Sequence, residues 1–419
     1  MLNKIFSFFI CSSLLLITGN LYSQVYEVHP PNHIQTIEFK GSTKLSQLPI
    51  ISLGSNLSLS FDDLHADEKN YYYRINHYNF DWTPSIISKN EYLDGFDESR
   101  IRNYTNSSNT LQSYSHYELR IPNNDVKRLK ISGNYILEIL DSDYNIVFSR
   151  KFMVVERLVG VDVQIKRSRD LSTIDELQSV QFTVTSPDMI ITNPRETVKA
   201  SVLQNSNIHS AINDLKPQHT IGNDLIYKYD KEASFPGGNE YLYFDSKDIR
   251  ASGNGIQRVE MSDLYDHFLY IDRPQKHRTY THSPDINGNF LVRSLDTHNP
   301  DIGAEYVRTH FALRYHEKLG NKEIHIYGNF NNFTIDDSTY MAWNPESGLY
   351  ENSRLFKQGF YNYKYVTIDD YGNIDESAIS GDFWQTENEY TVLIYYRDIG
   401  QRYDKIIGVG QGNSTAITN

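Results

Sequence analysis

Short segments of alternating apolar and polar residues recur along the whole chain, separated by a few turn-forming residues. They include 56–61 (NLSLSF), 134–140 (NYILEIL), 306–315 (YVRTHFALRY) and 390–396 (YTVLIYY). A period of two is typical of β-strands, in which successive side chains point to opposite faces. The best helical candidate, STIDELQSV at 172–180, spans only about two turns before strand-like residues resume. The pattern therefore predicts an all-β fold.

Turn-forming residues divide these segments into three groups. DSDYN at 141–145 separates two alternating segments, and Asn287-Gly288 is a dipeptide typical of a two-residue hairpin turn. Short strands at such spacing are typical of β-sandwiches. We therefore predict three consecutive Ig-like or early-set β-sandwich domains, packed tightly because no charged or Gly/Ser-rich linker separates them. Their predicted ranges are 25–156, 157–278 and 279–419.

The first residues have the pattern of a secretory signal peptide. Lys4 precedes an apolar stretch at 5–17, and the small residue Ser23 offers a cleavage point before Gln24. The alternative is a transmembrane helix, but the apolar stretch is shorter than a bilayer requires. We therefore expect residues 1–23 to be removed on export.

Composition narrows the choice of partners and chemistry. Cys11, the only cysteine, lies inside the apolar stretch and not at its end, so we expect no lipid anchor and a mature chain without disulfides or thiolate sites. The net charge of -13 comes from dispersed acidic residues, which disfavours nucleic acid as a partner. The 32 tyrosines suit β-strands and are also typical of protein-recognition surfaces.

Motifs of enzyme chemistry are absent from the sequence. There is no G-x-S-x-G, H-E-x-x-H or phosphate-binding loop, and GVGQG at 408–412 precedes a short tail, so we interpret it as a terminal strand. The segment 285–296 has calcium-loop spacing, but Phe290 stands where that loop requires glycine, and a hairpin explains it better. We therefore expect no catalytic residues, no metal and no cofactor.

The loop DWTPSIISKNEYLDGFDESRI at 81–101 combines aromatic and acidic residues. Such a loop offers a pair of catalytic carboxylates, a cation site or a protein-binding edge, and it is also typical of a structural loop held by its own aromatic rings. These alternatives stay open at this point. The candidate protein-interface residues are Trp82, Tyr92 and Phe96.

Several strings resemble, in order along the chain, the plug protein family of the type IX secretion system. They include LSLSFDDL, YYYRINHYNFDW, EYLDGFDESRI, SGNYILEI, NDLIYKYDKEASFPGGNEYLYFD and YTVLIYYRDIGQRYDKIIGV. The resemblance implies a periplasmic protein, not an enzyme, that is peripherally associated with the outer-membrane translocon barrel. It implies that the protein docks on the periplasmic end of that barrel and occludes it when no client is exported.

Residues 321–396 also resemble the glycogen-binding modules of early-set sandwiches. Phe333 replaces the tryptophan of that family's first turn, Lys364 is retained, and Tyr371 and Asn388 align with its second ring and its asparagine. The resemblance implies a retained scaffold with a vestigial sugar platform, and we expect no small-molecule substrate. The alternative function is that of an outer-membrane-associated glycan-binding protein.

Overall fold

The computed structural model describes residues 26–41 and 47–417. The predicted signal peptide at 1–23, with Cys11, lies outside these residues. The all-β prediction is confirmed, because strands dominate the chain and the segment 171–176 forms turns instead of a helix. Within the described ranges no helix is long and apolar enough to cross a membrane. The helical turns are α1 (Lys89–Tyr92), α2 (Pro194–Thr197), α3 (Pro300–Gly303), η1 (Asn329–Asn331) and η2 (Ser414–Ala416).

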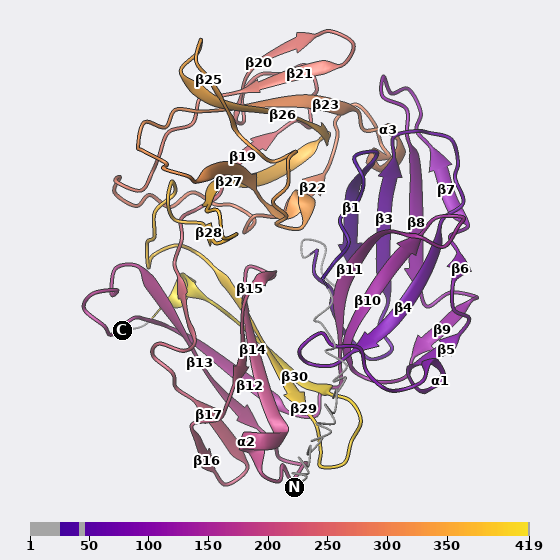
Figure 1. Cartoon of the computed structure of the whole chain (residues 1–419), viewed down its shortest axis with the longest axis vertical. Coiled ribbons are helices and arrows are strands. Elements are labelled where there is room, and N and C mark those ends of the chain that lie inside the picture. The colour runs from indigo at the N-terminus through magenta and orange to yellow at the C-terminus, as the bar shows by residue number, and fades with distance from the viewer. Residues whose placement is uncertain (1–25, 42–46, 418–419) are drawn as a thin grey trace, which may run out of the picture.

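The strands form three lobes, and the first lobe is a sandwich at the right of Figure 1. One of its sheets contains, in spatial order, β1 (Ile34–Lys40), β3 (Leu57–Asp63), β8 (Ser115–Ile121) and β7 (Asn103–Asn106). A separate small sheet pairs β5 (Leu93–Gly95) with β9 (Val126–Leu129). The core is rich in aromatic rings: Phe61 stacks on Tyr117 and meets Phe148 edge-on.

A nine-stranded sheet runs from the first lobe into the second without interruption. In spatial order it contains β15 (Asn207–Leu215), β14 (Val198–Gln204), β29 (Glu389–Tyr396), β30 (Lys405–Asn413), β11 (Ile146–Val155), β10 (Gly133–Leu140), β4 (Tyr72–Tyr78) and β6 (Ser99–Arg100), with β2 (Ile50–Ser52) also paired to β11. The lobes join where Val155 of β11 pairs with Ile406 of β30. The predicted turn at 141–145 forms the hairpin between β10 and β11.

The two faces of this sheet bury different cores. Val155 and Ile406 point to one face, where they belong to the same apolar cluster as Trp82. Val154 and Ile407 point to the other face, where Val154 lies in the core of the first lobe and Ile407 in the core of the second. Because paired residues point to the same side of a sheet, the first two lobes lie on one face of a shared scaffold.

The second lobe packs a smaller sheet on that scaffold. Its strands are β12 (Gly160–Arg167), β13 (Leu177–Thr185), β16 (His219–Ile221), β17 (Asp224–Tyr227) and β18 (Ser234–Pro236). GVGQG forms part of strand β30, as predicted, and its glycines have a packing role. A Cβ atom on Gly408 would lie 2.5 Å from the side chain of Val159, just before β12, and one on Gly410 would lie 2.7 Å from Val161 of β12. The glycines therefore let the two strands approach closely.

The third lobe, orange at the top of Figure 1, is a sandwich of two sheets. One contains β19 (Leu242–Asp245), β22 (Phe290–Val292), β24 (Glu323–Tyr327), β27 (Gly359–Ile368) and β28 (Ile374–Asp375). The other contains β20 (Ile256–Met261), β21 (Tyr265–Leu269), β23 (Tyr306–Leu313), β26 (Leu349–Lys357) and β25 (Ala342–Asn344). Asn287 and Gly288 form a turn with positive φ, but no strand precedes it, so the predicted hairpin is wrong.

The predicted boundary between the second and third domains does not follow the cores. Strands β19 to β21, predicted in 157–278, belong to the third lobe, whereas β29 and β30, predicted in 279–419, complete the second. The third lobe is thus inserted between strands of the second, as the yellow strands in Figure 1 show. Alternation marks a strand but does not name its partner, and β14 pairs with a strand far along the chain.

A buried ion pair joins the first lobe to the third. Lys357 Nζ lies 2.7 Å from Asp62 Oδ2, and the two side chains are 1% and 0% exposed. Tyr306 donates a hydrogen bond to the same oxygen at 2.7 Å, and His116 Nδ1 lies 2.6 Å from Asp62 Oδ1. Lys357 also donates to the Asp301 carbonyl at 2.6 Å. Buried charges require such partners, so this network fixes how the lobes meet.

Replacing Lys357 with methionine tests this network. We expect Lys357→Met to lower the free energy of unfolding by about 3–5 kcal/mol, because it leaves the Asp62 carboxylate buried without its cation. The measurement is urea unfolding. The control is Lys322→Met, which removes an ion pair with Asp375 that is exposed to solvent and should change stability little. Equal, small effects of both variants would contradict the assignment.

Candidate functional site

The loop at 81–101 buries two of its three candidate interface rings. Trp82 is 7% exposed and lies under the Lys151 ammonium, 4.5 Å from the ring centroid. Tyr92 is 5% exposed, packs beside Tyr135 and His77, and is held at the end of α1. Both rings therefore anchor the loop to the fold, which agrees with the alternative of a structural loop held by its own aromatic rings.

Phe96 is 73% exposed and is the candidate ring that a partner can reach. Each of the five carboxylates in the loop has a partner. Asp94 pairs with Arg128, Asp97 with Lys89, Glu98 with Arg74 and Glu91 with Arg402, whereas Asp81 accepts hydrogen bonds from the backbone and hydroxyl of Thr83. Glu91 also caps α1 through the backbone and side chain of Ser88. The loop thus presents one apolar ring among paired charges, and it does not present two free carboxylates facing each other.

The four residues expected in a sugar platform do not converge. Phe333 is buried against Tyr327, and Tyr371 is 91% exposed in the turn between β27 and β28. Asn388 lies in the second lobe, where its amide donates to the Gly237 carbonyl at 2.8 Å. Stacking on a sugar requires exposed rings beside polar groups, and these residues do not form such a surface.

Lys364 has a structural partner in place of a ligand. It is buried and forms an ion pair with Glu376, and its ammonium lies 4.9 Å from the centroid of the Tyr241 ring. Burial alone would lower the pKa of Lys364, but the charge of Glu376 outweighs it and holds the pKa above its ordinary value. Lys364 is therefore part of a buried ion pair of the third lobe and is not exposed to a sugar.

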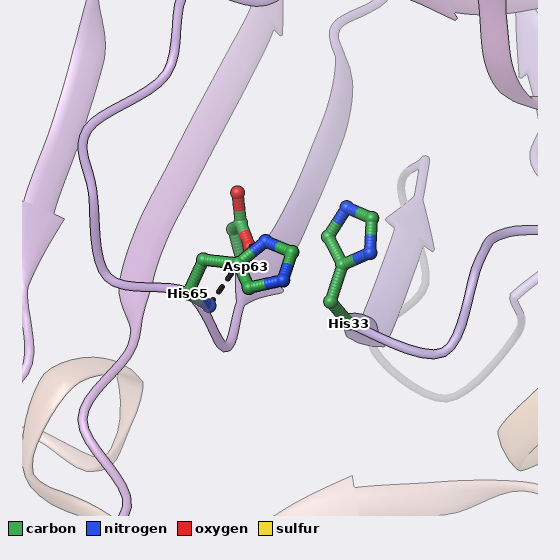
Figure 2. Close-up of side chains that lie close together, drawn as sticks. All are labelled: His33, Asp63 and His65. Carbon is green, nitrogen blue, oxygen red and sulfur yellow. Dashed lines mark hydrogen bonds and ion pairs between the residues drawn. The ribbon is translucent and has the colours of Figure 1, made fainter.

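A cluster that the sequence did not reveal joins His33, Asp63 and His65, drawn in Figure 2. The pairing of β1 with β3 brings the two histidines together, with ring centroids 4.2 Å apart. Imidazole and carboxylate groups are metal ligands. Here, however, Lys69 Nζ lies 2.8 Å from His65 Nδ1 and 3.9 Å from Asp63 Oδ2. An ammonium thus supplies the positive charge, and a metal ion would have to displace it.

A second group of metal-ligand type consists of His116, Glu118 and Asp301. Its histidine already bonds Asp62 through Nδ1. Within residues 26–41 and 47–417 these two groups are the ones in which at least three such side chains gather. The expectation of no metal stays a prediction.

An open groove of about 460 Å³ lies on the outer sheet of the third lobe. Arg258 covers Phe268 at 3.6 Å from the ring centroid, and Phe268 stacks on His310 with centroids 4.2 Å apart. The three residues come from β20, β21 and β23 and lie side by side in the register. The alternation in 306–315 could have predicted that His310 lies on the outer face of its strand. It could not have predicted that this strand pairs with β21 and so brings His310 beside Phe268.

Comparisons with known proteins agree with this architecture. The model of a family described as "Type 9 secretion system plug protein 1st domain" matches residues 34–156. The crystal structure of a hypothetical protein from Parabacteroides merdae is similar, with a TM-score of 0.88 and 31% sequence identity over 93% of this chain and 100% of that chain. The comparison with curated proteins gives no match.

The two roles inside the 81–101 loop can be separated by stability measurements. We expect Tyr92→Ala to cost about 3–5 kcal/mol in the free energy of unfolding, because it removes a buried ring. Phe96→Ala should change it by no more than about 0.5 kcal/mol, because its ring is in solvent. Urea denaturation of both variants checks this, and a strongly destabilised Phe96→Ala would show that the ring packs against the fold.

Proposed function

The chain belongs to the type 9 secretion system plug protein family, and we propose that it docks on the periplasmic end of the outer-membrane translocon barrel and occludes it when no client is exported. The family implies a role in type IX secretion and a periplasmic location near the secretion apparatus. The observation that carries the proposal is the family match over 34–156, which spans the strands of the first lobe from β1 to β11.

The way the lobes are joined supports a steric role. A plug must keep its shape while it fills an opening, so its lobes must not move freely. The first and second lobes share a sheet, and the first and third share the Asp62 and Lys357 ion pair. Glu305 of the third lobe also accepts hydrogen bonds from the backbone of Leu111 and Gln112, at 2.6 and 3.2 Å. These contacts favour a single rigid body.

Phe96 is the contact that we propose within the 81–101 loop. Interface anchors are often aromatic side chains that become buried on binding, surrounded by a polar rim. Phe96 has this setting, since its neighbours Asp94 and Asp97 are charged and already paired. Trp82 and Tyr92 support the loop from below and do not reach the surface.

The alternative glycan-binding function gains no support from the arrangement. Phe333 and Lys364 are buried, Tyr371 stands alone in solvent, and Asn388 lies in another lobe. We also propose that the protein is not an enzyme, because four of the five acidic residues of the 81–101 loop form ion pairs and the fifth, Asp81, is hydrogen-bonded to Thr83.

Loss of the protein tests occlusion directly. Deleting its gene should leave export of type IX clients largely intact but let large solutes enter the periplasm, because the barrel would stand open. The measurement is uptake of an antibiotic too large for ordinary porins, with the wild-type gene restored as control. An outer membrane that remains as tight as in the parent strain would contradict the proposal.

Replacing Phe96 tests the contact surface. We expect Phe96→Ala to weaken co-purification with the barrel by about tenfold or more, as loss of an interface anchor does. The matched control is Leu171→Ala, which truncates another exposed apolar side chain, in the second lobe. If the folded Phe96→Ala protein co-purifies as well as the control, this loop is not part of the interface.

A further inference from the structure

A small cavity lies where the first and third lobes meet. Its volume is about 50 Å³, and residues of the segment 29–37 line it together with Arg150 of β11. The third lobe contributes residues of the segment 330–338 and Arg354 of β26. Two arginines from different lobes therefore line the cavity.

Arg150 occupies a position that normally holds an apolar residue. It lies on the same face of β11 as Phe148 and Phe152, which belong to the first core, and it is 6% exposed. Its guanidinium donates a hydrogen bond to the Ser149 carbonyl at 2.9 Å and forms no ion pair with any described carboxylate. Burial lowers the pKa of Arg150, and only the more distant charge of Glu27 opposes this effect.

The guanidinium of Arg354 has even fewer hydrogen-bond partners than that of Arg150. Its guanidinium lies beside the rings of Phe330 and Phe356, 5.3 and 5.8 Å from their centroids. The side chain is partly buried, but its Nη1 atom is enclosed without a hydrogen-bond partner. Burial lowers the pKa of Arg354 to about 10, and the charge of Asp336 counteracts this only in part. The Oδ1 atom of Asp336 is already occupied by the backbone and hydroxyl of Ser338.

The charges around the cavity do not balance. Two arginines and one carboxylate, that of Asp336, line the cavity, and His29 uses its Nδ1 in a contact with Thr334 at 3.2 Å. A buried charge without a partner costs several kcal/mol, so natural structures rarely keep one. The arrangement therefore points to a negatively charged group that is supplied from outside the chain.

We propose that this cavity binds a small oxyanion of the sulfate or phosphate type, which Arg150 and Arg354 hold together and which thereby bridges the first and third lobes. Guanidinium groups match such anions in shape and hydrogen-bond geometry. A cavity needs about 10–15 Å³ to hold one water, so a volume of about 50 Å³ leaves room for a small ion of a few heavy atoms.

Thermal unfolding of the mature protein tests the site. Sodium sulfate should raise the melting temperature of the wild type in a saturable way beyond sodium chloride of equal ionic strength, because an anion that binds the folded state stabilises it. Arg354→Met and Arg150→Met should each lose this saturable shift. The control is Arg169→Met, which removes an exposed arginine of the second lobe and should keep the shift.

The order of stability of the wild type and Arg354→Met should also depend on sulfate, which simple charge screening would not produce. Without sulfate, Arg354→Met should be at least as stable as the wild type, because it removes a partly buried guanidinium whose Nη1 atom has no partner. With saturating sulfate the order should reverse. Titration calorimetry of the wild type with sodium sulfate provides a readout that does not depend on the variants folding. Absence of saturable binding there, or retention of the sulfate shift by folded Arg354→Met, would overturn the proposal.

Discussion

The arrangement of the lobes depends on the buried ion pair between Asp62 and Lys357. A carboxylate and an ammonium lose most of their hydration when they are buried this deeply. The free-energy cost of that loss is offset only if their partners lie at hydrogen-bonding distance. Both oxygens of Asp62 have such partners, from the first lobe through His116 and from the third through Tyr306 and Lys357. Sliding one lobe past the other would break several of these bonds together, so the network sets one position for the third lobe.

The second lobe is held to the first in a different way, because its strands continue the sheet of the first lobe. The backbone bonds between β11 and β30 make the two lobes parts of one scaffold, and Trp82 packs on the far face of that scaffold with Met153 and Ile406. The third lobe is inserted into the second and docked on the first, so the chain closes a ring of contacts. A body closed in this way suits obstruction of a channel. The proposed anion would add a further bridge between the first and third lobes, close to the same junction.

Alternation predicted strands that bury one face. The segment 56–61, for example, overlaps β3, in which Leu57, Leu59 and Phe61 are buried and Ser58 and Ser60 are less so. It could not predict that β29 and β30 return to the second lobe, since periodicity marks which face is buried and not what covers it. The candidate loop shows the same limit: Tyr92 and Phe96 are aromatic residues four positions apart, and only packing against Tyr135 makes one a core residue. Arg150 did leave a signal, because the alternation of 147–155 places it between Phe148 and Phe152.

The claim that the lobes form one rigid body can be tested most directly by hydrogen exchange of the native protein, resolved to single strands. The strands to compare are β10, β14 and β27, one from each lobe. If the lobes form one rigid body, their most protected amides should all exchange through one opening, with the free energy of global unfolding. If the amides of β27 exchanged through an opening of distinctly lower free energy than those of β10, the third lobe would be an independent unit, which contradicts a single rigid body.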